Sequence, residues 1–484
     1  MTALRASTLG ELAIPTPPYD RGKVTAGIVH VGVGGFHRAH KAMYVDRLLA
    51  AGSREWGICG VGTQALDRRM RDVLVAQDGL YTLVLKHPDG RVEPRVIGSI
   101  VDYLYAPDDP EAVIERMAAP TTHIVSLTIT EGGYLVDPVT RAFAPTDPAV
   151  LLDLQPDAVP RTVFGLVTEA LVRRRERGLP PFTVVSCDNV QGNGDIAKHA
   201  FVGFATLRNP ELGGWVSEQV AFPSSMVDRI TPVTSDEDRA LLALEFGVED
   251  GSPVVAEPFE QWVLEDDFCD GRPDWAAAGV QLVDDVHPYE LMKLRLLNAG
   301  HQALGYLGYL AGYRRTDEVC RNPHFVRFLL RYLENEATPT LAPVPGVDLA
   351  AYRATLLERF GNPHVRDTLA RLCTDTSDRI PTFLLPVVRE RLARGGDVTC
   401  SALVVASWAR YAEGVDEHGE PIEVVDRQLE TVRAAAVKRD DPMAFLRETG
   451  LFGDLASDPA FADAYVAQRR RLTQLGAKAA VASL

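Results

Sequence analysis

Three observations predict that this chain adopts an α/β fold, with a doubly wound parallel sheet in its amino-terminal part and a mostly α-helical carboxyl-terminal part. Short runs rich in β-branched residues alternate with longer periodic segments up to His287. A glycine-rich turn follows the first of these runs. From Pro288 onward the segments carry helical periodicity and are separated by proline or glycine. A single hydrophobic core stops growing at about 250–300 residues, so we expect two domains, residues 1–287 and 288–484.

The elements expected in the first domain are strands joined by crossover helices. Strands are predicted at Gly27–Val31, Gly57–Val61, Leu80–Leu85, His123–Thr128 and Phe182–Ser186. One helix is predicted at Ala39–Ala51, just after the glycine turn, and another at Arg161–Arg177, where apolar residues recur at intervals of three and four.

The second domain is expected to consist mainly of helices. Their predicted ranges are Tyr289–Tyr313, Pro323–Glu336, Asp348–Phe360, Thr382–Arg394, Ser401–Glu413 and Pro459–Leu475. The stretch Thr338–Gly346 is rich in proline, and we interpret it as a loop inside this helical domain.

Composition restricts the class of partner. The 484 residues include 50 Lys and Arg against 66 Asp and Glu, a formal net charge of −16. This excess of negative charge would repel nucleic acids and anionic lipids, which are themselves negatively charged.

The six cysteines are scattered and are expected to be reduced thiols. No apolar run reaches the roughly 18 residues of a membrane helix, and the amino terminus lacks a signal-peptide pattern. We therefore expect a soluble, cytoplasmic protein that binds neither nucleic acid nor membrane.

The glycine-rich turn is the first candidate binding site. Gly32 and Gly34 are expected where the chain needs positive φ and close backbone approach, so that a pyrophosphate can rest on the amides of the next helix. His37 occupies the place of the third glycine of the dinucleotide fingerprint, and an ordinary glycine turn is the alternative interpretation. The candidate cofactor-binding residues here are Gly32, Gly34, Gly35, Phe36, His37 and Arg38.

An acidic residue after the second strand should bind the ribose hydroxyls of the cofactor. Asp67 is the candidate, although it lies further along the chain than usual. Arg68 or Arg69 could instead meet the 2′-phosphate of NADP, and a solvated first turn of a helix is the simplest alternative. NAD is the preferred cofactor.

A lysine-bearing helix carries the strongest chemical signal. On an α-helix Asn298 lies about 140° and His301 about 80° around from Lys293, so one broad face could present an amine, an amide and an imidazole. A surface lysine beside two packing residues is the alternative. Asn189, after the strand ending at Ser186, and Glu131, beside a Gly-Gly turn, stand near strand ends where such sheets bind ligands. Turn capping would also account for both.

At these residues the sequence resembles the long-chain mannitol dehydrogenase family, which comprises polyol-specific NAD-dependent dehydrogenases, arabinitol dehydrogenases and hexuronate reductases. The resemblance covers nearly the whole chain, and its most specific part is the K-x5-N-x2-H signature at Lys293, Asn298 and His301. The other matching stretches are residues 32–40, 77–83, 128–134, 186–189 and 222–230. The resemblance implies a Rossmann-type amino-terminal domain, a helical carboxyl-terminal domain, an active site in the cleft between them, no metal ion, and a monomer.

The resemblance also implies roles for individual residues. Lys293 is expected to be the general base, and Asn189 and Asn298 are expected to donate hydrogen bonds to the reacting oxygen. His301 and Asp228 are expected to bind or orient the substrate. Glu131 resembles a carboxylate beside a proton channel.

Two cations limit the substrate assignment. Arg379 stands where mannitol-type members commonly carry lysine, and Arg371 is a second cation in the same segment. A guanidinium fork suits a carboxylate, so a hexuronate substrate is possible in this sequence. The preferred hypothesis is a polyol dehydrogenase that interconverts D-mannitol and D-fructose, with D-arabinitol and D-sorbitol as further candidates. A fructuronate or tagaturonate reductase is the alternative, and a non-catalytic dinucleotide-binding sensor is a remote one.

Overall fold

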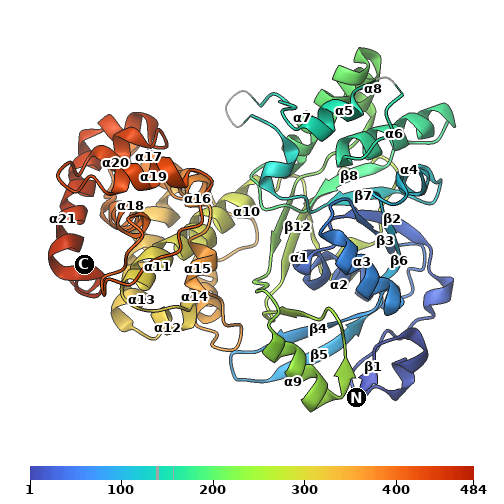
Figure 1. The fold of residues 1–484 in the computed structure, drawn as a ribbon, viewed down its shortest axis with the longest axis horizontal. Helices are drawn as coiled ribbons and strands as arrows, with labels where there is room; N and C mark the ends of the chain where they lie inside the picture. Colours follow the sequence, from blue (N-terminus) through green and yellow to red (C-terminus); the bar gives the residue numbers. More distant parts are fainter. Residues whose placement is uncertain (138–140, 156) are drawn as a thin grey trace. The chain divides into compact units, whose positions relative to one another are not determined.

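The computed structural model describes residues 1–137, 141–155 and 157–484. Its internal contacts divide the chain into two compact units, Met1–His287 and Pro288–Leu484 (Figure 1). The first is an α/β unit and the second is mainly helical, so the predicted fold class is confirmed.

The first unit is built on a five-stranded parallel sheet with the strand order β6-β3-β2-β7-β8. The strands are β2 (Ala26–Val31), β3 (Gly57–Gly62), β6 (Ile100–Tyr105), β7 (Ile124–Leu127) and β8 (Thr183–Ser186). The chain builds one half outward from β2 and then returns to place β7 on the other side of it. This reversal makes the carboxyl ends of β2 and β7 the topological switch point, where open α/β sheets bind ligands.

Both faces of this sheet are covered. Val29 and Val31 pack with α4 (Pro110–Ala118), α6 (Val163–Glu176) and α7 (Asn193–Arg208). Their neighbour Ile28 points to the opposite face, where it joins a core with α2 (Lys41–Ala50) and β12 (Gln261–Glu265). Burial on both faces explains why β2 does not alternate between apolar and polar residues, His30 being its one polar side chain.

Two predictions for the first unit need correction, and one strand of its main sheet was missed. The predicted strand Leu80–Leu85 is β4 (Tyr81–Lys86), but it belongs to a separate sheet with β5 (Val92–Ile97) and β11 (Val254–Ala256). Strand β6 was not predicted, although it forms an edge of the main sheet. The predicted helix Ala39–Ala51 is broken at His40, whose backbone is not helical (φ −120°, ψ −92°), into α1 (Gly35–Ala39) and α2.

Two smaller sheets complete the strand pairing described in this unit. Strand β9 (Ser225–Asp228) runs antiparallel to β12, which also pairs with β13 (Gln281–Val283). Strand β1 (Thr2–Ala3) pairs with β10 (Val248–Glu249).

The second unit is organised around α11 (Ala299–Leu310), which is buried along nearly its whole length. Among the helices packed against α11 are α15 (Leu369–Leu372), α18 (Thr399–Ala412) and α21 (Pro459–Ala482). Further helices that match predicted ranges are α13 (Pro323–Arg331), α14 (Leu349–Phe360) and α17 (Leu385–Ala393). Within the described ranges, none of the helices is both long and apolar enough to span a membrane.

Candidate active site

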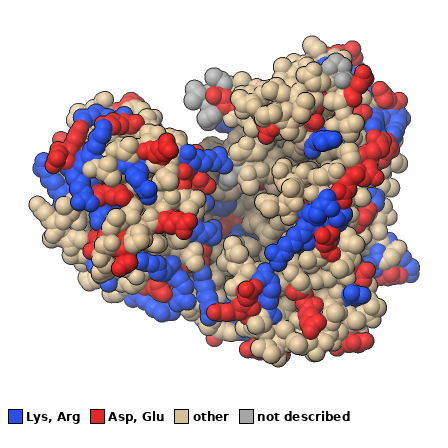
Figure 2. All heavy atoms as spheres, in the orientation of Figure 1, with Lys and Arg blue, Asp and Glu red and all other residues tan. Residues whose placement is uncertain are grey.

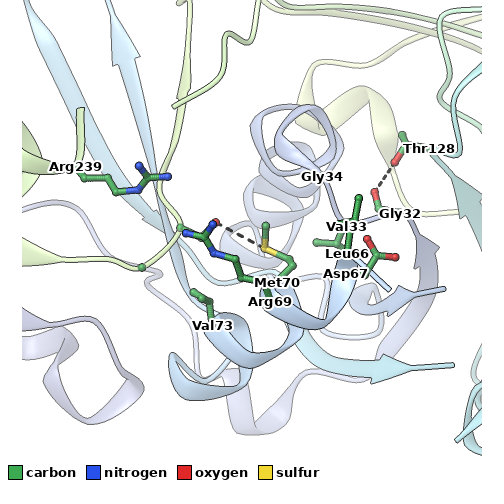
Figure 3. Close-up of a pocket in the computed structure, with 12 residues that line it drawn as sticks. Gly32, Val33, Gly34, Leu66, Asp67, Arg69, Met70, Val73, Thr128 and Arg239 are labelled. Atoms are coloured by element: carbon green, nitrogen blue, oxygen red, sulfur yellow. Dashed lines mark hydrogen bonds between the residues drawn. The ribbon is translucent and has the colours of Figure 1, made fainter. Parts of the chain in front are cut away.

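A pocket of about 410 Å³ opens in the first unit beside the glycine-rich turn (Figure 3). Its lining includes Gly32 and Gly34, which follow β2, and Thr128, which follows β7. Asp67, the first residue of α3 (Asp67–Ala76), lies on the same pocket. The structure therefore brings three of the residues predicted to bind the cofactor to the switch point of the sheet.

The two glycines serve different purposes. Gly32 has φ +92°, and a Cβ atom there would lie 2.1 Å from the carbonyl oxygen of Thr128, so only glycine fits. Gly34 has φ −89°, so the prediction of positive φ is wrong at this position. A Cβ at Gly34 would meet nothing within 4 Å, which leaves open space for a ligand to approach the backbone.

His37 and Arg38 support the turn and do not line the pocket. The His37 ring stacks on His30 with centroids 3.4 Å apart, and burial lowers the pKa of His37 well below its usual value. The Arg38 guanidinium donates hydrogen bonds to the carbonyl oxygens of Gly34 and Ser252. Contact of these side chains, and of Gly35 and Phe36, with a cofactor stays a prediction.

Asp67 holds the turn that precedes it. Its Oδ2 accepts hydrogen bonds from the backbone amides of Thr63 (2.9 Å) and Gln64 (2.8 Å). Arg68, one of the two arginines considered for a 2′-phosphate, instead pairs with Asp108 at 2.8 Å and does not line the pocket.

A second cluster lies at the carboxyl ends of β7 and β8. The carboxylate of Asp188 accepts hydrogen bonds from the amides of Ile129 (3.0 Å) and Thr130 (2.9 Å) and from the hydroxyl of Tyr134 (2.7 Å). Thr130 has φ +67° and ψ 163°, a conformation that costs about 1–3 kcal/mol in a residue other than glycine. Asp188 therefore fixes a strained turn at the place where Glu131 begins a short 3-10 helix. The side chain of Glu131 lies outside the described residues.

Asn189 follows Asp188 and is half-buried. The loop after β8 is joined to β9 by Asn193, a residue that no sequence pattern singled out. Its Nδ2 donates to the carbonyl oxygens of Asp188 (3.0 Å) and Ser225 (2.7 Å), and its Oδ1 accepts from the Ser225 amide (2.9 Å). Asp228 ends β9 and is buried, with 3% of its surface exposed.

In the second unit, Lys293 and Asn298 lie on a π-helix rather than on the predicted α-helix. The π-helix η5 (Lys293–Asn298) joins α10 (His287–Met292) to α11. A π-helix has i→i+5 hydrogen bonds and more residues per turn than an α-helix, so residues five apart lie closer to the same side than the separation of about 140° on an α-helix. The π turn therefore brings the amine and the amide of the signature onto one side.

His301 lies in the first turn of α11, and its ring centroid is 4.2 Å from that of Phe360. Lys293, Asn298 and His301 are all buried, with 7%, 8% and 6% of their surfaces exposed. Arg295 points away from this group, because it donates hydrogen bonds to the Thr340 carbonyl (2.8 Å) and to Glu390 (2.5 Å).

Of the two arginines considered for a substrate carboxylate, Arg371 is fully engaged by another side chain and Arg379 is engaged through one nitrogen. Arg371 forms a two-pronged ion pair with Asp367, at 2.6 Å and 2.5 Å. This arrangement and the nearby His301 keep the pKa of Asp367 below its usual value although burial opposes the shift. The Nη1 of Arg379 donates to the carbonyl oxygens of Arg371 and Leu372, both at 3.0 Å. Asp367 was not singled out in the sequence, and its only signal there is the i,i+4 spacing to Arg371.

Across the described residues, no group of three or more His, Cys, Asp and Glu side chains is placed to hold a metal ion.

Two family models match the chain. Residues 26–277 match the mannitol dehydrogenase Rossmann domain, and residues 285–473 match the mannitol dehydrogenase C-terminal domain. Mannitol 2-dehydrogenase of Phaeosphaeria nodorum is 47% identical over 99% of this chain and 85% of its own length. The enzyme of the same name from Aspergillus fumigatus is 48% identical over 93% of this chain and 92% of its own length.

Two solved structures have the same fold over almost the full length. Pseudomonas fluorescens mannitol 2-dehydrogenase, in a ternary complex with NAD and D-mannitol, has a TM-score of 0.92 and 43% identity, and each chain is covered to 99%. A D-sorbitol dehydrogenase in substrate-free form has a TM-score of 0.89 and 39% identity, with 99% of this chain and 100% of that chain covered.

Proposed function

Because the chain belongs to the mannitol dehydrogenase family, we propose that it is an NAD-dependent polyol dehydrogenase that interconverts D-mannitol and D-fructose. The observation that carries this proposal is the buried π-helix, which aligns Lys293 with Asn298 and is followed by His301. π-helical turns occur frequently at functional sites, and an amine beside an amide suits the removal of a proton from an alcohol.

The pocket of the first unit fits a dinucleotide. Gly32 allows the tight turn, and the open space above Gly34 leaves room for a pyrophosphate at the start of α1. Asp67 has one carboxylate oxygen engaged by the Thr63 and Gln64 amides, and the other is available to a ribose hydroxyl. When bound, NAD supplies the hydride acceptor.

Lys293 is the proposed general base. As the C2–H bond of the polyol breaks and its electron pair leaves as hydride, the hydroxyl proton passes to the neutral Nζ of Lys293, and the C2–O bond becomes a carbonyl. In the reverse direction the protonated amine returns this proton to the ketose oxygen. Asn298 and Asn189 donate N–H groups to the oxygen while negative charge develops on it, which stabilises the transition state more than the ground state.

The remaining proposed residues position the substrate and carry protons. His301 and Asp228 are assigned to neighbouring hydroxyl groups of the polyol. Glu131 is assigned to the exchange of protons between Lys293 and water. A buried base needs such an exit, because it must lose its proton before the next turnover.

The engagement of Arg371 by Asp367 favours a neutral polyol over a hexuronate. To bind a substrate carboxylate in a bidentate manner, an arginine needs two guanidinium N–H groups that have no other partner. The fork of Arg371 already holds Asp367, and Arg379 uses its Nη1 on backbone carbonyls.

The test is reduction of NAD⁺ by the purified protein with D-mannitol, D-sorbitol, D-arabinitol or D-mannonate, in the presence and absence of EDTA. We expect turnover with D-mannitol, formation of D-fructose, and the same rate with the chelator. Turnover restricted to D-mannonate would contradict the proposal and assign Arg371 and Arg379 to a carboxylate. No turnover with any of these substrates, together with retained binding of NADH, would favour the sensor.

A further inference from the structure

We propose that Arg69 and Arg239 form a subsite for a phosphate on the 2′ position of the adenosine ribose, so that the enzyme uses NADP as well as NAD. This inference rests on the proposed function and concerns the same pocket. Both arginines line that pocket together with Gly32, Gly34 and Asp67.

The two arginines reach the pocket from different elements. Arg69 lies in the first turn of α3, two residues after Asp67, and Arg239 lies on α9 (Asp236–Phe246). Figure 3 shows their side chains extending into the same space from opposite sides, on the side of the pocket away from Gly32 and Thr128. Asp67 is drawn beside Gly32, whereas the two arginines lie further along α3, near Met70 and Val73. They therefore flank the part of the pocket beyond the glycine turn that would hold the pyrophosphate.

The charges of the pocket lining favour an additional anion. Asp67, Arg69 and Arg239 are the charged residues of the described lining, so cations outnumber the carboxylate. The negative charge of Asp67 is already compensated in part by two backbone amides. In a site that selects NAD alone, the carboxylate after the second strand acts without opposing cations and repels a 2′-phosphate.

Both guanidinium groups can accept a phosphate. In the described part of the chain, no ion pair and no hydrogen bond engages the guanidinium group of Arg69. Arg239 pairs with Asp236 at 2.6 Å, but that carboxylate is fully exposed, so solvent screens the pair and it can be exchanged at little cost. An arginine fork matches two phosphate oxygens at once.

An apolar surface beside these cations fits a nucleotide rather than free phosphate. Leu66 precedes Asp67, lines the pocket and is 91% exposed. Met70 and Val73 continue the apolar lining along α3. An exposed leucine next to a ribose-binding carboxylate is suited to packing against the adenine ring.

The experiment compares both coenzymes with D-mannitol in the wild-type enzyme and in three variants. We expect the wild-type enzyme to reduce NADP⁺ as well as NAD⁺. Arg69→Ser and Arg239→Ser should each lower kcat/KM for NADP⁺ by about tenfold or more and for NAD⁺ by less than about threefold, since each removes a charge-assisted hydrogen bond to the 2′-phosphate alone. Arg68→Ser is the matched control, because Arg68 is a neighbouring cation that pairs with Asp108 outside the pocket. It should leave both values nearly unchanged.

Two kinetic outcomes would overturn the subsite while leaving the proposed function intact. One is a wild-type enzyme that reduces NAD⁺ but not NADP⁺. The other is an equal loss with both coenzymes in Arg69→Ser, which would place this arginine on the pyrophosphate that the two coenzymes share.

Calorimetric titration with adenosine 2′,5′-bisphosphate and with 5′-AMP tests the subsite even if no polyol is oxidised. The wild-type protein should bind the bisphosphate at least about tenfold more tightly than 5′-AMP, and Arg69→Ser should remove that difference. Equal affinity of the wild-type protein for the two nucleotides would contradict the proposal.

Discussion

At the scale of single residues, Lys293 is the group on which the proposed chemistry depends. Lys293→Ala should lower the rate of hydride transfer by about 10²–10⁴-fold, because the alcohol then loses its proton acceptor. Asn298→Ala, five residues further along the same π turn, should lower kcat by about 10²–10³-fold through the loss of an oxyanion donor. Single-turnover kinetics with D-mannitol measures both, and NADH titration checks that coenzyme binding persists. A loss below about tenfold in Lys293→Ala would remove the lysine from the mechanism.

A second lysine, Lys41, is buried, and no carboxylate of the described residues pairs with it. It is 1% exposed, its Nζ has no hydrogen-bond partner within the described ranges, and the ring of Trp262 lies 5.9 Å away. Desolvation lowers the pKa of Lys41 to about 8 from 10.5, which means that the folded state disfavours the charged amine.

Replacing this amine should stabilise the protein. Lys41→Met should raise the free energy of unfolding at pH 7 by about 2–3 kcal/mol, because both folded and unfolded chains carry the charge there and only the folded chain must desolvate it. Between pH 8 and 10.5 the unfolded wild-type chain holds the additional proton, so its stability should rise with pH, and this rise should be absent from the variant. Urea unfolding across that range measures both effects. The control is Lys23→Met, since the Lys23 side chain is 77% exposed.

At the scale of elements, the turn after β7 depends on one carboxylate. Asp188→Asn should lower the free energy of unfolding by about 2–3 kcal/mol, because an amide cannot accept hydrogen bonds from both the Ile129 and Thr130 amides and the Tyr134 hydroxyl. It should also lower kcat, since the strained turn positions Glu131 and the neighbouring Asn189. Hydrogen exchange at Thr130 and Tyr134 would show the loosening directly. Asp195→Asn, at an exposed carboxylate on α7, is the control, and equal stability of the two variants would contradict this assignment.

The elements also show how far sequence alone predicts this site. Strands β2 and β8 were predictable because burial on both faces makes them rich in β-branched residues without polar alternation, between turn residues. The break at His40 and the π turn at Lys293 were not, because neither interrupts the helical periodicity of the sequence. The partners of Asp188 are distant in sequence, so its role became visible only when the chain was folded.

At the scale of the whole molecule, the net charge of −16 does not by itself attract an anionic coenzyme. Acidic and basic side chains are intermixed over the face shown in Figure 2. Attraction for phosphate groups must therefore come from local features of the pocket, namely the amides at the start of α1 and the nearby arginines. The expected monomeric state stays a prediction, which light scattering after gel filtration would test.

The residues proposed to hold NAD belong to the first unit, whereas the proposed base belongs to the second. NAD⁺ at 100 times its dissociation constant should stabilise the unit that binds it by about 2.7 kcal/mol. Because Lys293 is not among the residues proposed to hold the coenzyme, Lys293→Ala should show the same NAD⁺-dependent rise in melting temperature as the wild-type enzyme, although we expect it to lose turnover. Hydrogen exchange should show protection around Gly32 and Asp67. A rise that disappears in Lys293→Ala would mean that coenzyme binding and the base are coupled, and the two units would then have to be treated as a single binding site.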